Sequence, residues 1–203
     1  SKEQYWLLLP VLEGKLQILQ GASEFERNGL VEREGTQYYA ERFNFDGKVY
    51  IFGGGHLAQE VVPVLSHLGF RCVILDDREE FSRPELFTGA EEVLCVDFKD
   101  LAKAVQITEN DYVAVMTRGH LHDADVERFV LKTPAHYIGV VGSRRKAKLT
   151  RETLRGEGFS DEQLDRIITP IGLEIGSETP AEIAISIAAQ FIQVRANRLV
   201  NMR

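Results

Sequence analysis

The stretch that most constrains the fold is residues 48–58, which read KVYIFGGGHLA. Residues 49–52 have the length and the β-branched and aromatic character of a buried strand, and three glycines end that strand at once. Apolar residues with helical spacing follow as far as Gly69, a residue type that commonly ends helices. The sequence therefore predicts a strand, a glycine turn and a helix, with a kink in the helix at Pro63.

The glycine turn fits a nucleotide-binding fingerprint. Gly53, Gly55 and Ala58 fill the pattern G-x-G-x-x-A, in which the small last residue lets the helix and the strand pack closely. Free backbone amides at the start of the helix suit a phosphate group. The next predicted strand ends in Asp76 and Asp77, the acids expected roughly 20 residues on for a pair of ribose hydroxyls. The pattern favours a nucleotide-type site over its alternative, a Rossmann-like turn that binds nothing.

Strands and helices alternate from residue 48 onward. Further strands are predicted at residues 72–75, 92–96, 112–116, 137–141 and 167–168. Helical patterns lie between them at 84–87, 100–105, 122–131 and 143–157, and begin again at Ser160 and Thr179. Because the strands are continuously apolar, they indicate a parallel sheet covered on both faces. The predicted fold class is α/β, a Rossmann-like doubly wound parallel sheet of six strands in two halves.

Residues 1–47 do not share this rhythm. Apolar segments at 6–12, 15–19 and 37–45, with a charged, glycine-interrupted stretch at 24–35, indicate short strands joined by turns. We therefore expect residues 1–47 to form a small amino-terminal β-rich appendage, either a lobe or an edge extension of the sheet. Residues 48–203 are expected to form a Rossmann-like domain that binds a nucleotide or cofactor.

Composition excludes several classes of partner. The formal net charge of −7 argues against nucleic acid or an anionic membrane, since both need a basic face. Cys72 and Cys95 lie within apolar strand patterns, so we expect small hydrophobic groups there rather than reactive thiols. They give no disulfide framework, which fits a reducing compartment. No apolar run reaches membrane-spanning length and residues 1–20 lack a signal-peptide pattern, so a cytoplasmic location is expected.

Polar residues that follow the predicted strands form the candidate binding site. In open α/β sheets, ligands bind beyond the carboxyl ends of the strands, near the switch in strand order. The residues expected to converge there are Gly53, Gly54, Gly55, His56, Asp76, Asp77, Arg78, Thr117, Arg118, His120, Gly142, Ser143 and Arg144. No Tyr is followed four residues later by Lys, so the proton relay of short-chain reductases is missing. A general acid would have to be His56, His120 or His122.

The segment 120–123 is also a candidate metal site. His120, His122 and Asp123 would place two imidazoles and a carboxylate around one turn, and these groups suit several divalent ions. The alternative is a polar loop that caps the next helix, with Asp123 near its positive end. Both interpretations stay open at this point.

Two predicted helices carry patterns that suggest partners. A basic stripe recurs at i, i+4, i+7 and i+11, at Arg144, Lys148, Arg151 and Arg155. In an acidic protein the stripe is either a docking strip for an acidic partner or a solvated face, and Arg144 and Lys146 could also meet a phosphate. The final helix, from Pro180, is apolar over much of its circumference. We expect one face on the sheet and another in a homodimer contact.

Five segments together resemble a known family. They are FGGGHLA, LDDR, TRGHLHD, YIGVVGSRRK and above all PIGLEIGSETPAEIAISIAAQ, which is long and combines Gly, Thr-Pro and Glu at fixed spacing. They are similar to the carboxy-terminal Rossmann domain of the xanthine dehydrogenase accessory protein family (XdhC-like), over residues 45–195. The glycine-rich, cysteine-bearing motif of that family's first domain has no match in residues 1–47, which contain no Cys.

The resemblance implies a role in maturing molybdenum hydroxylases. Such a protein binds molybdenum cofactor (molybdopterin or its dinucleotide), protects it during sulfuration by a cysteine desulfurase, and delivers it to the apoenzyme. This function needs little or no catalysis, and the phosphate of the cofactor would suit the glycine turn. Two alternatives stay open: an NAD(P)-dependent oxidoreductase, and a nucleotide-sensing regulatory domain that switches a partner without chemistry.

Overall fold

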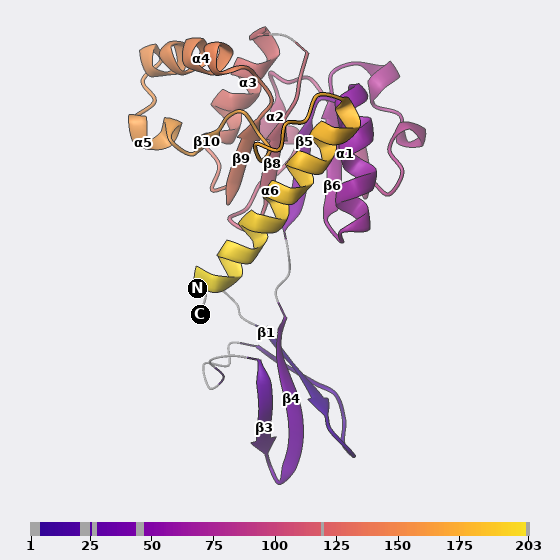
Figure 1. Cartoon of the computed structure of the whole chain (residues 1–203). Coiled ribbons are helices and arrows are strands. Elements are labelled where there is room, and N and C mark those ends of the chain that lie inside the picture. Colours follow the sequence, from indigo (N-terminus) through magenta and orange to yellow (C-terminus); the bar gives the residue numbers. More distant parts are fainter. Residues whose placement is uncertain (1–4, 21–24, 26–27, 44–46, 119, 202–203) are drawn as a thin grey trace. The chain divides into compact units, whose positions relative to one another are not determined.

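The computed structural model describes residues 5–20, 25, 28–43, 47–118 and 120–201 (Figure 1). The chain divides into two compact units, one made of residues 46–196 and the other of residues 1–45 with 197–203. Each unit has its own sheet, and the candidate site residues all belong to the larger unit.

The larger unit is built on a parallel sheet. Its strands are β5 (Lys48–Phe52), β6 (Arg71–Asp76), β7 (Glu92–Cys95), β8 (Tyr112–Val115), β9 (Tyr137–Val140) and β10 (Ile167–Ile168). They lie in the order β10-β9-β8-β5-β6-β7, and every neighbouring pair is parallel. The chain leaves β5 towards β6 and β7, then returns to pair β8 with the other side of β5. The prediction of a Rossmann arrangement is confirmed, and its topological switch point lies between β5 and β8.

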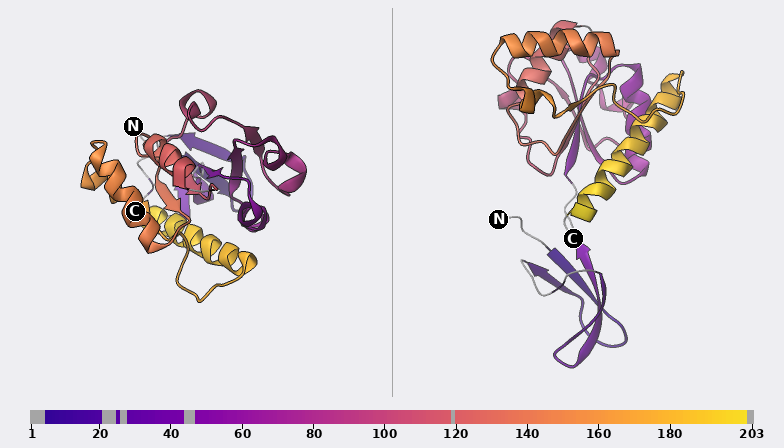
Figure 2. Two further views of the ribbon diagram at one scale, coloured as in Figure 1. Left: turned by 90° about the horizontal axis from the view of Figure 1, so that it is seen from above. Right: turned by 60° about the vertical axis from the view of Figure 1, so that its left-hand side comes forward.

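Successive residues of each strand point to opposite faces, and both faces are covered. On β5, Val49 and Ile51 join one core, whereas Tyr50 and Phe52 join the other. Helices α1 (His56–His67) and α6 (Pro180–Asn201) supply the first core, with Val61 and other buried residues. The second core takes side chains from α2 (Leu101–Ala104), α3 (His120–Val130), α4 (Arg144–Gly156) and α5 (Asp161–Leu164). Figures 1 and 2 show these layers. Burial on both sides explains why the strands read as continuous apolar runs.

The helix ends follow the signals in the sequence. Gly69 adopts φ +83° directly after α1, where its amide donates to Ser66 O. Ser143 Oγ accepts from Lys146 N at the start of α4, and Ser160 opens α5 with a complete capping box. Pro63 lies inside α1, which continues to His67; the kink stays a prediction. Short 3₁₀ helices at Glu79–Phe81 (η1) and Pro84–Leu86 (η2) connect β6 to β7.

The amino-terminal residues form an antiparallel sheet, as the predicted β-rich appendage requires. Its strands β1 (Tyr5–Pro10), β2 (Gln17–Gln20), β3 (Gly29–Arg33) and β4 (Thr36–Phe43) lie in the order β2-β1-β4-β3. One face is a small core of Trp6, Leu8, Tyr38 and Ala40. β3 was hidden in the charged stretch 24–35; it forms because Glu34 and Gly35, with φ of 52° and 74°, make a tight hairpin turn into β4.

The two cysteines differ in exposure, which corrects one expectation. Cys72 is buried in β6, and burial raises the pKa of its thiol to about 12. Cys95 is exposed, contrary to the expectation, because it ends β7 at the edge of the sheet. In the described ranges, no helix combines the length and apolarity needed to cross a bilayer.

Candidate functional site

The loops that follow the strands are joined in one row at the carboxyl edge of the sheet. The first residues after β5, β8 and β9 donate their amides to the end of a neighbouring strand: Gly53 to Leu75 O at 2.7 Å, Met116 to Phe52 O at 2.8 Å and Val141 to Val115 O at 2.8 Å. Val96 and Ile171 extend the row to Asp76 O at 2.9 Å and Val140 O at 3.0 Å. The candidate residues after β5, β6, β8 and β9 therefore lie along one edge.

The space around the three glycines of the turn differs, and so does the constraint that requires glycine at each position. Gly53 adopts φ +106°, and a Cβ there would lie 2.5 Å from Met116 O. A Cβ on Gly54 would lie 2.2 Å from Phe81 O. Both residues are thus required by the close approach of other backbone segments. A Cβ on Gly55 meets no atom of the described chain within 4 Å, so packing does not explain this glycine.

The start of α1 lacks the side-chain capping seen on α4, α5 and α6. Gly55 is its N-cap residue, no side chain of the described residues accepts a hydrogen bond from its first amides, and no acid lies in its first turn. By contrast, side chains cap α4 and α5, and Thr179 Oγ1 accepts from Glu182 N at the start of α6. The unsatisfied amides and the positive end of the helix dipole make the start of α1 suited to an anion.

Asp76 is the anchor of this turn. It is 1% exposed, and its Oδ2 accepts from Gly54 N at 2.7 Å and from Arg78 Nη2 at 3.0 Å. Its Oδ1 accepts from Arg78 N at 3.0 Å and Nε at 2.9 Å. Burial alone would raise the pKa of Asp76, but the hydrogen bonds from Arg78 and Gly54 outweigh it and hold the pKa below its ordinary value. Asp76 is therefore an ionised carboxylate that fixes the glycine turn.

The other residues after β6 are more accessible. Asp77 is exposed, with its carboxylate 3.8 Å from Arg78 Nε. The Arg78 guanidinium also lies over the ring of Phe81, 3.9 Å from its centroid. Since Asp76 already accepts four hydrogen bonds, Asp77 is the acid better placed to meet a ribose from solvent.

The loop after β8 joins a buried charged cluster. Thr117 Oγ1 donates to Asp123, which is 1% exposed, and Lys146 Nζ forms an ion pair with the same carboxylate. Lys146 is thus held by Asp123 rather than left free for a phosphate. Among the described residues, no group of three metal-ligating side chains is found, and the side chains of His120 and His122 lie outside the described part. The metal hypothesis therefore has only Asp123 within that part, and this residue already has partners.

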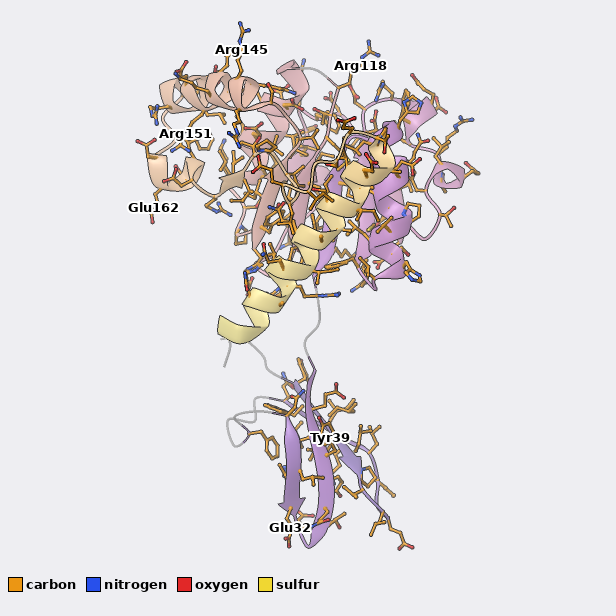
Figure 3. The ribbon with its side chains drawn as sticks, in the orientation of Figure 1. Glu32, Tyr39, Arg118, Arg145, Arg151 and Glu162 are labelled. Carbon is orange, nitrogen blue, oxygen red and sulfur yellow. The ribbon has the colours of Figure 1, made fainter. Side chains whose placement is uncertain are left out.

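A groove adjoins the end of β9. Gly142, Ser143 and Arg144 line it together with the loop of residues 170–177, and its volume is about 810 Å³. Arg144 Nη2 lies 3.2 Å from Glu174 Oε1 across the groove. Figure 3 shows Arg118, after β8, and Arg145, on α4, both pointing away from the sheet at this edge. The sequence did not predict that the loop 170–177 lines the site, because its place beside β9 depends on the fold.

The basic stripe of α4 is partly neutralised. Arg151 Nη2 lies 3.1 Å from Asp161 Oδ1 and 2.6 Å from Asp165 Oδ1, and Arg155 also pairs with Asp161. The stripe is therefore not a continuous row of unpaired basic side chains, because Asp161 and Asp165 pair with its second half. Lys148 and Arg145 are exposed and form no ion pair with a described residue.

Comparison with known proteins identifies the family. The model of the XdhC Rossmann domain matches residues 49–191, a span that contains every candidate site residue. YqeB of Escherichia coli K12, an uncharacterized protein, is 31% identical over 151 residues, which are 74% of this chain and 28% of YqeB. A probable xanthine dehydrogenase subunit of Bacillus subtilis is 28% identical over 160 residues, 79% of this chain and 46% of that protein.

A solved structure agrees with these matches. The crystal structure of a xanthine dehydrogenase from Bacillus halodurans superposes with a TM-score of 0.73 at 27% identity, covering 97% of this chain and 61% of that one. This chain thus spans less than half of each of the two curated relatives, YqeB and the Bacillus subtilis protein. The family model covers most of the chain, including the glycine turn and the groove loop, so the chain belongs to the XdhC family and carries its Rossmann domain.

Proposed function

We propose that this chain is an accessory protein in the maturation of a molybdenum hydroxylase such as xanthine dehydrogenase. In this role it holds molybdenum cofactor, or a related nucleotide, at the carboxyl edge of its sheet and delivers it to the apoenzyme. Membership of the XdhC family and the names of the relatives support the link with xanthine dehydrogenase. The cofactor would supply the redox chemistry in the client enzyme, so this chain needs only to bind and release it.

The observation that carries the proposal is the open, uncapped start of α1. Phosphate needs backbone amides and room for close approach, and both are present where Gly55 faces open space. Molybdopterin carries one phosphate, and its dinucleotide form carries a pyrophosphate and a ribose, which would lie towards Asp77 beyond β6. The residues present therefore fit the phosphate end of the cofactor.

Binding at Gly55 is tested by substitution. Gly55→Val should abolish ligand binding while leaving the fold intact, because its side chain fills the space left for the phosphate. Gly156→Val is the matched control, since Gly156 is also open within the described chain but lies at the far end of α4. Native mass spectrometry of protein from its own host identifies the ligand by mass. Unchanged ligand occupancy in Gly55→Val, or equal loss in both variants, would exclude this site.

A second function is favoured by Arg78. In dinucleotide-binding Rossmann folds, an Arg beside the acid after the second strand accommodates the 2′-phosphate of NADP. Arg78 lies at that place and is held by Asp76 and Phe81. An NAD(P)-dependent oxidoreductase is therefore the alternative, and a bound mass equal to NADP in the same experiment would select it.

Assembly is part of the proposal. On α6, Ile187 and Phe191 are buried against the sheet, whereas Ile185 and Ile192 are 53% and 41% exposed. The exposed isoleucines support a homodimer contact through α6, with the exposed residues of α4 left for the apoenzyme and a cysteine desulfurase. Analytical ultracentrifugation of the double variant Ile185→Glu with Ile192→Glu, compared with the parent chain, tests the dimer. The parent should have the mass of a dimer and the variant that of a monomer; equal masses for the two proteins would exclude this contact.

A further inference from the structure

A cavity lies beside the candidate site, under α4. Its volume is about 190 Å³, and it is lined from α3, α4, α5 and the ends of β9 and β10. Apolar walls come from Val140, Leu164, Ile167 and Ala147. An apolar cavity of about 150 Å³ holds benzene, so this cavity has room for a single aromatic ring.

Two polar groups on the cavity wall have no hydrogen-bond partner among the described residues. Glu127 is 5% exposed and lines the cavity, and no described group donates to its carboxyl. Thr169 also lines the cavity, and its Oγ1 is buried without a partner. Native proteins rarely leave a buried polar atom such as Thr169 Oγ1 unsatisfied, and Glu127 lines the same cavity, so the two groups indicate a missing partner in this space.

The charges around Glu127 define what that partner must be. On its own helix, Asp123 lies one turn before it and Arg128 follows it, and Lys146 faces it from α4. Lys146 pairs with Asp123, and Arg128 pairs with Asp125 and Glu157. Two further basic residues line the cavity: Arg151 pairs with Asp161 of α5 and with Asp165 at the end of that helix, and Lys148 is exposed. Glu127 is thus a carboxyl without a cation of its own. Burial, and after it the charge of Asp123, raises the pKa of Glu127 to about 7, while Lys146 and Arg128 oppose this rise.

We propose that this cavity is a second binding site, for a small planar ligand that carries an amidine-type pair of N–H donors. The carboxylate of Glu127 accepts both N–H groups in a fork, as carboxylates do with guanidinium, and the Thr169 hydroxyl binds a further polar atom. The apolar walls hold the ring. Amidines, guanidines and amino-substituted nitrogen heterocycles belong to this class. The inference does not depend on the proposed function.

Benzamidine is the probe, because it joins one aromatic ring to an amidinium group. Calorimetry on the full chain should show one saturable site for benzamidine and no binding of benzoate, which has the same ring with the opposite charge. Binding should strengthen about tenfold from pH 6 to pH 8, as Glu127 with a pKa of about 7 becomes ionised. Glu127→Gln should weaken binding at pH 8 at least tenfold and remove its pH dependence.

Matched variants keep the test decisive. Glu152→Gln removes an exposed acid from α4 and should leave both the affinity and the pH dependence unchanged. Thr169→Val should weaken benzamidine several-fold but keep the pH dependence, so it tests the site even where Glu127→Gln fails to fold. Equal binding of benzyl alcohol and benzamidine would show a purely apolar cavity and overturn the proposal. An affinity that neither Glu127→Gln nor Thr169→Val changes, or no benzamidine binding at all, would overturn it equally.

Discussion

Replacing Asp76 with asparagine tests whether this carboxylate holds the glycine turn in place. The carboxylate accepts hydrogen bonds from Gly54 N and from three donors of Arg78, at 2.7 to 3.0 Å. Asparagine keeps one acceptor oxygen but turns an NH₂ group towards one set of these donors. Either the Gly54 amide or the Arg78 guanidinium then loses its acceptor. The loss occurs in a site that excludes water, since Asp76 is 1% exposed.

The expected loss follows from those contacts. A hydrogen bond to a charged group contributes roughly 1.5–3 kcal/mol, and breaking a buried ion pair costs about 3–5 kcal/mol. Arg78 is 24% exposed, so water can solvate part of its charge once the carboxylate is lost. We therefore expect the free energy of unfolding to fall by about 2–4 kcal/mol. For a unit of this size, the loss lowers the melting temperature by roughly 5–15 °C. Urea unfolding followed by circular dichroism measures the change at neutral pH.

The stabilising effect of Asp76 should depend on pH. Because the pKa of Asp76 is lowered in the folded state, its carboxylate stabilises the fold above the unfolded pKa of about 3.9. That contribution is lost as the pH falls through the lowered folded pKa, so the parent chain and Asp76→Asn should converge in acid. Asp77→Asn is the control and should change stability by about 0.5 kcal/mol or less. A loss below about 1 kcal/mol for Asp76→Asn, or parallel profiles at every pH, would refute the reasoning.

Three further predictions concern exposed groups. Asp77→Ala should weaken a dinucleotide by about 1–3 kcal/mol but leave a ligand without ribose unaffected, as calorimetry with both ligands would reveal. Arg145→Glu with Lys148→Glu should impair activation of an apo-hydroxylase but spare small-ligand binding; full activation at moderate salt would mean that these residues only face solvent. A maleimide should label Cys95 in the native protein and Cys72 only after unfolding; early labelling of Cys72 by mass spectrometry would contradict its burial.

The fold was predictable because its signals are local. The apolar runs, the glycines and the capping residues gave the six parallel strands and the starts of α4, α5 and α6. β3 was missed because its side chains alternate between half-buried and exposed, without a strong apolar pattern, and Leu30 is 70% exposed. The exposure of Cys95 depends on β7 lying at the sheet edge, which follows from strand order rather than from local sequence.

The candidate site was predictable in place but not in its internal bonds. The positions after the strands follow from topology, and residues such as Gly53 and Thr117 do adjoin at the switch point. Asp76 pairs with Arg78, and Lys146 pairs with Asp123. These ion pairs depend on side-chain packing, which the local sequence does not show. The burial of Glu127 was harder to predict. This acid lies between the buried Val126 and Val130 on one helix, and the sequence alone does not distinguish it from a solvated residue.

The row of amide bonds along the carboxyl edge makes the loops of the site one cooperative unit. Gly53 cannot shift without disturbing Leu75 O on one side and Met116 O on the other, since a Cβ there would lie 2.5 Å from that oxygen. Opening of any one loop exposes amides held by its neighbours, so these amides should exchange their hydrogens at similar rates. A phosphate that orders the start of α1 would then slow exchange as far away as Val141 and Ile171, and protection would spread along the edge from a single point of contact.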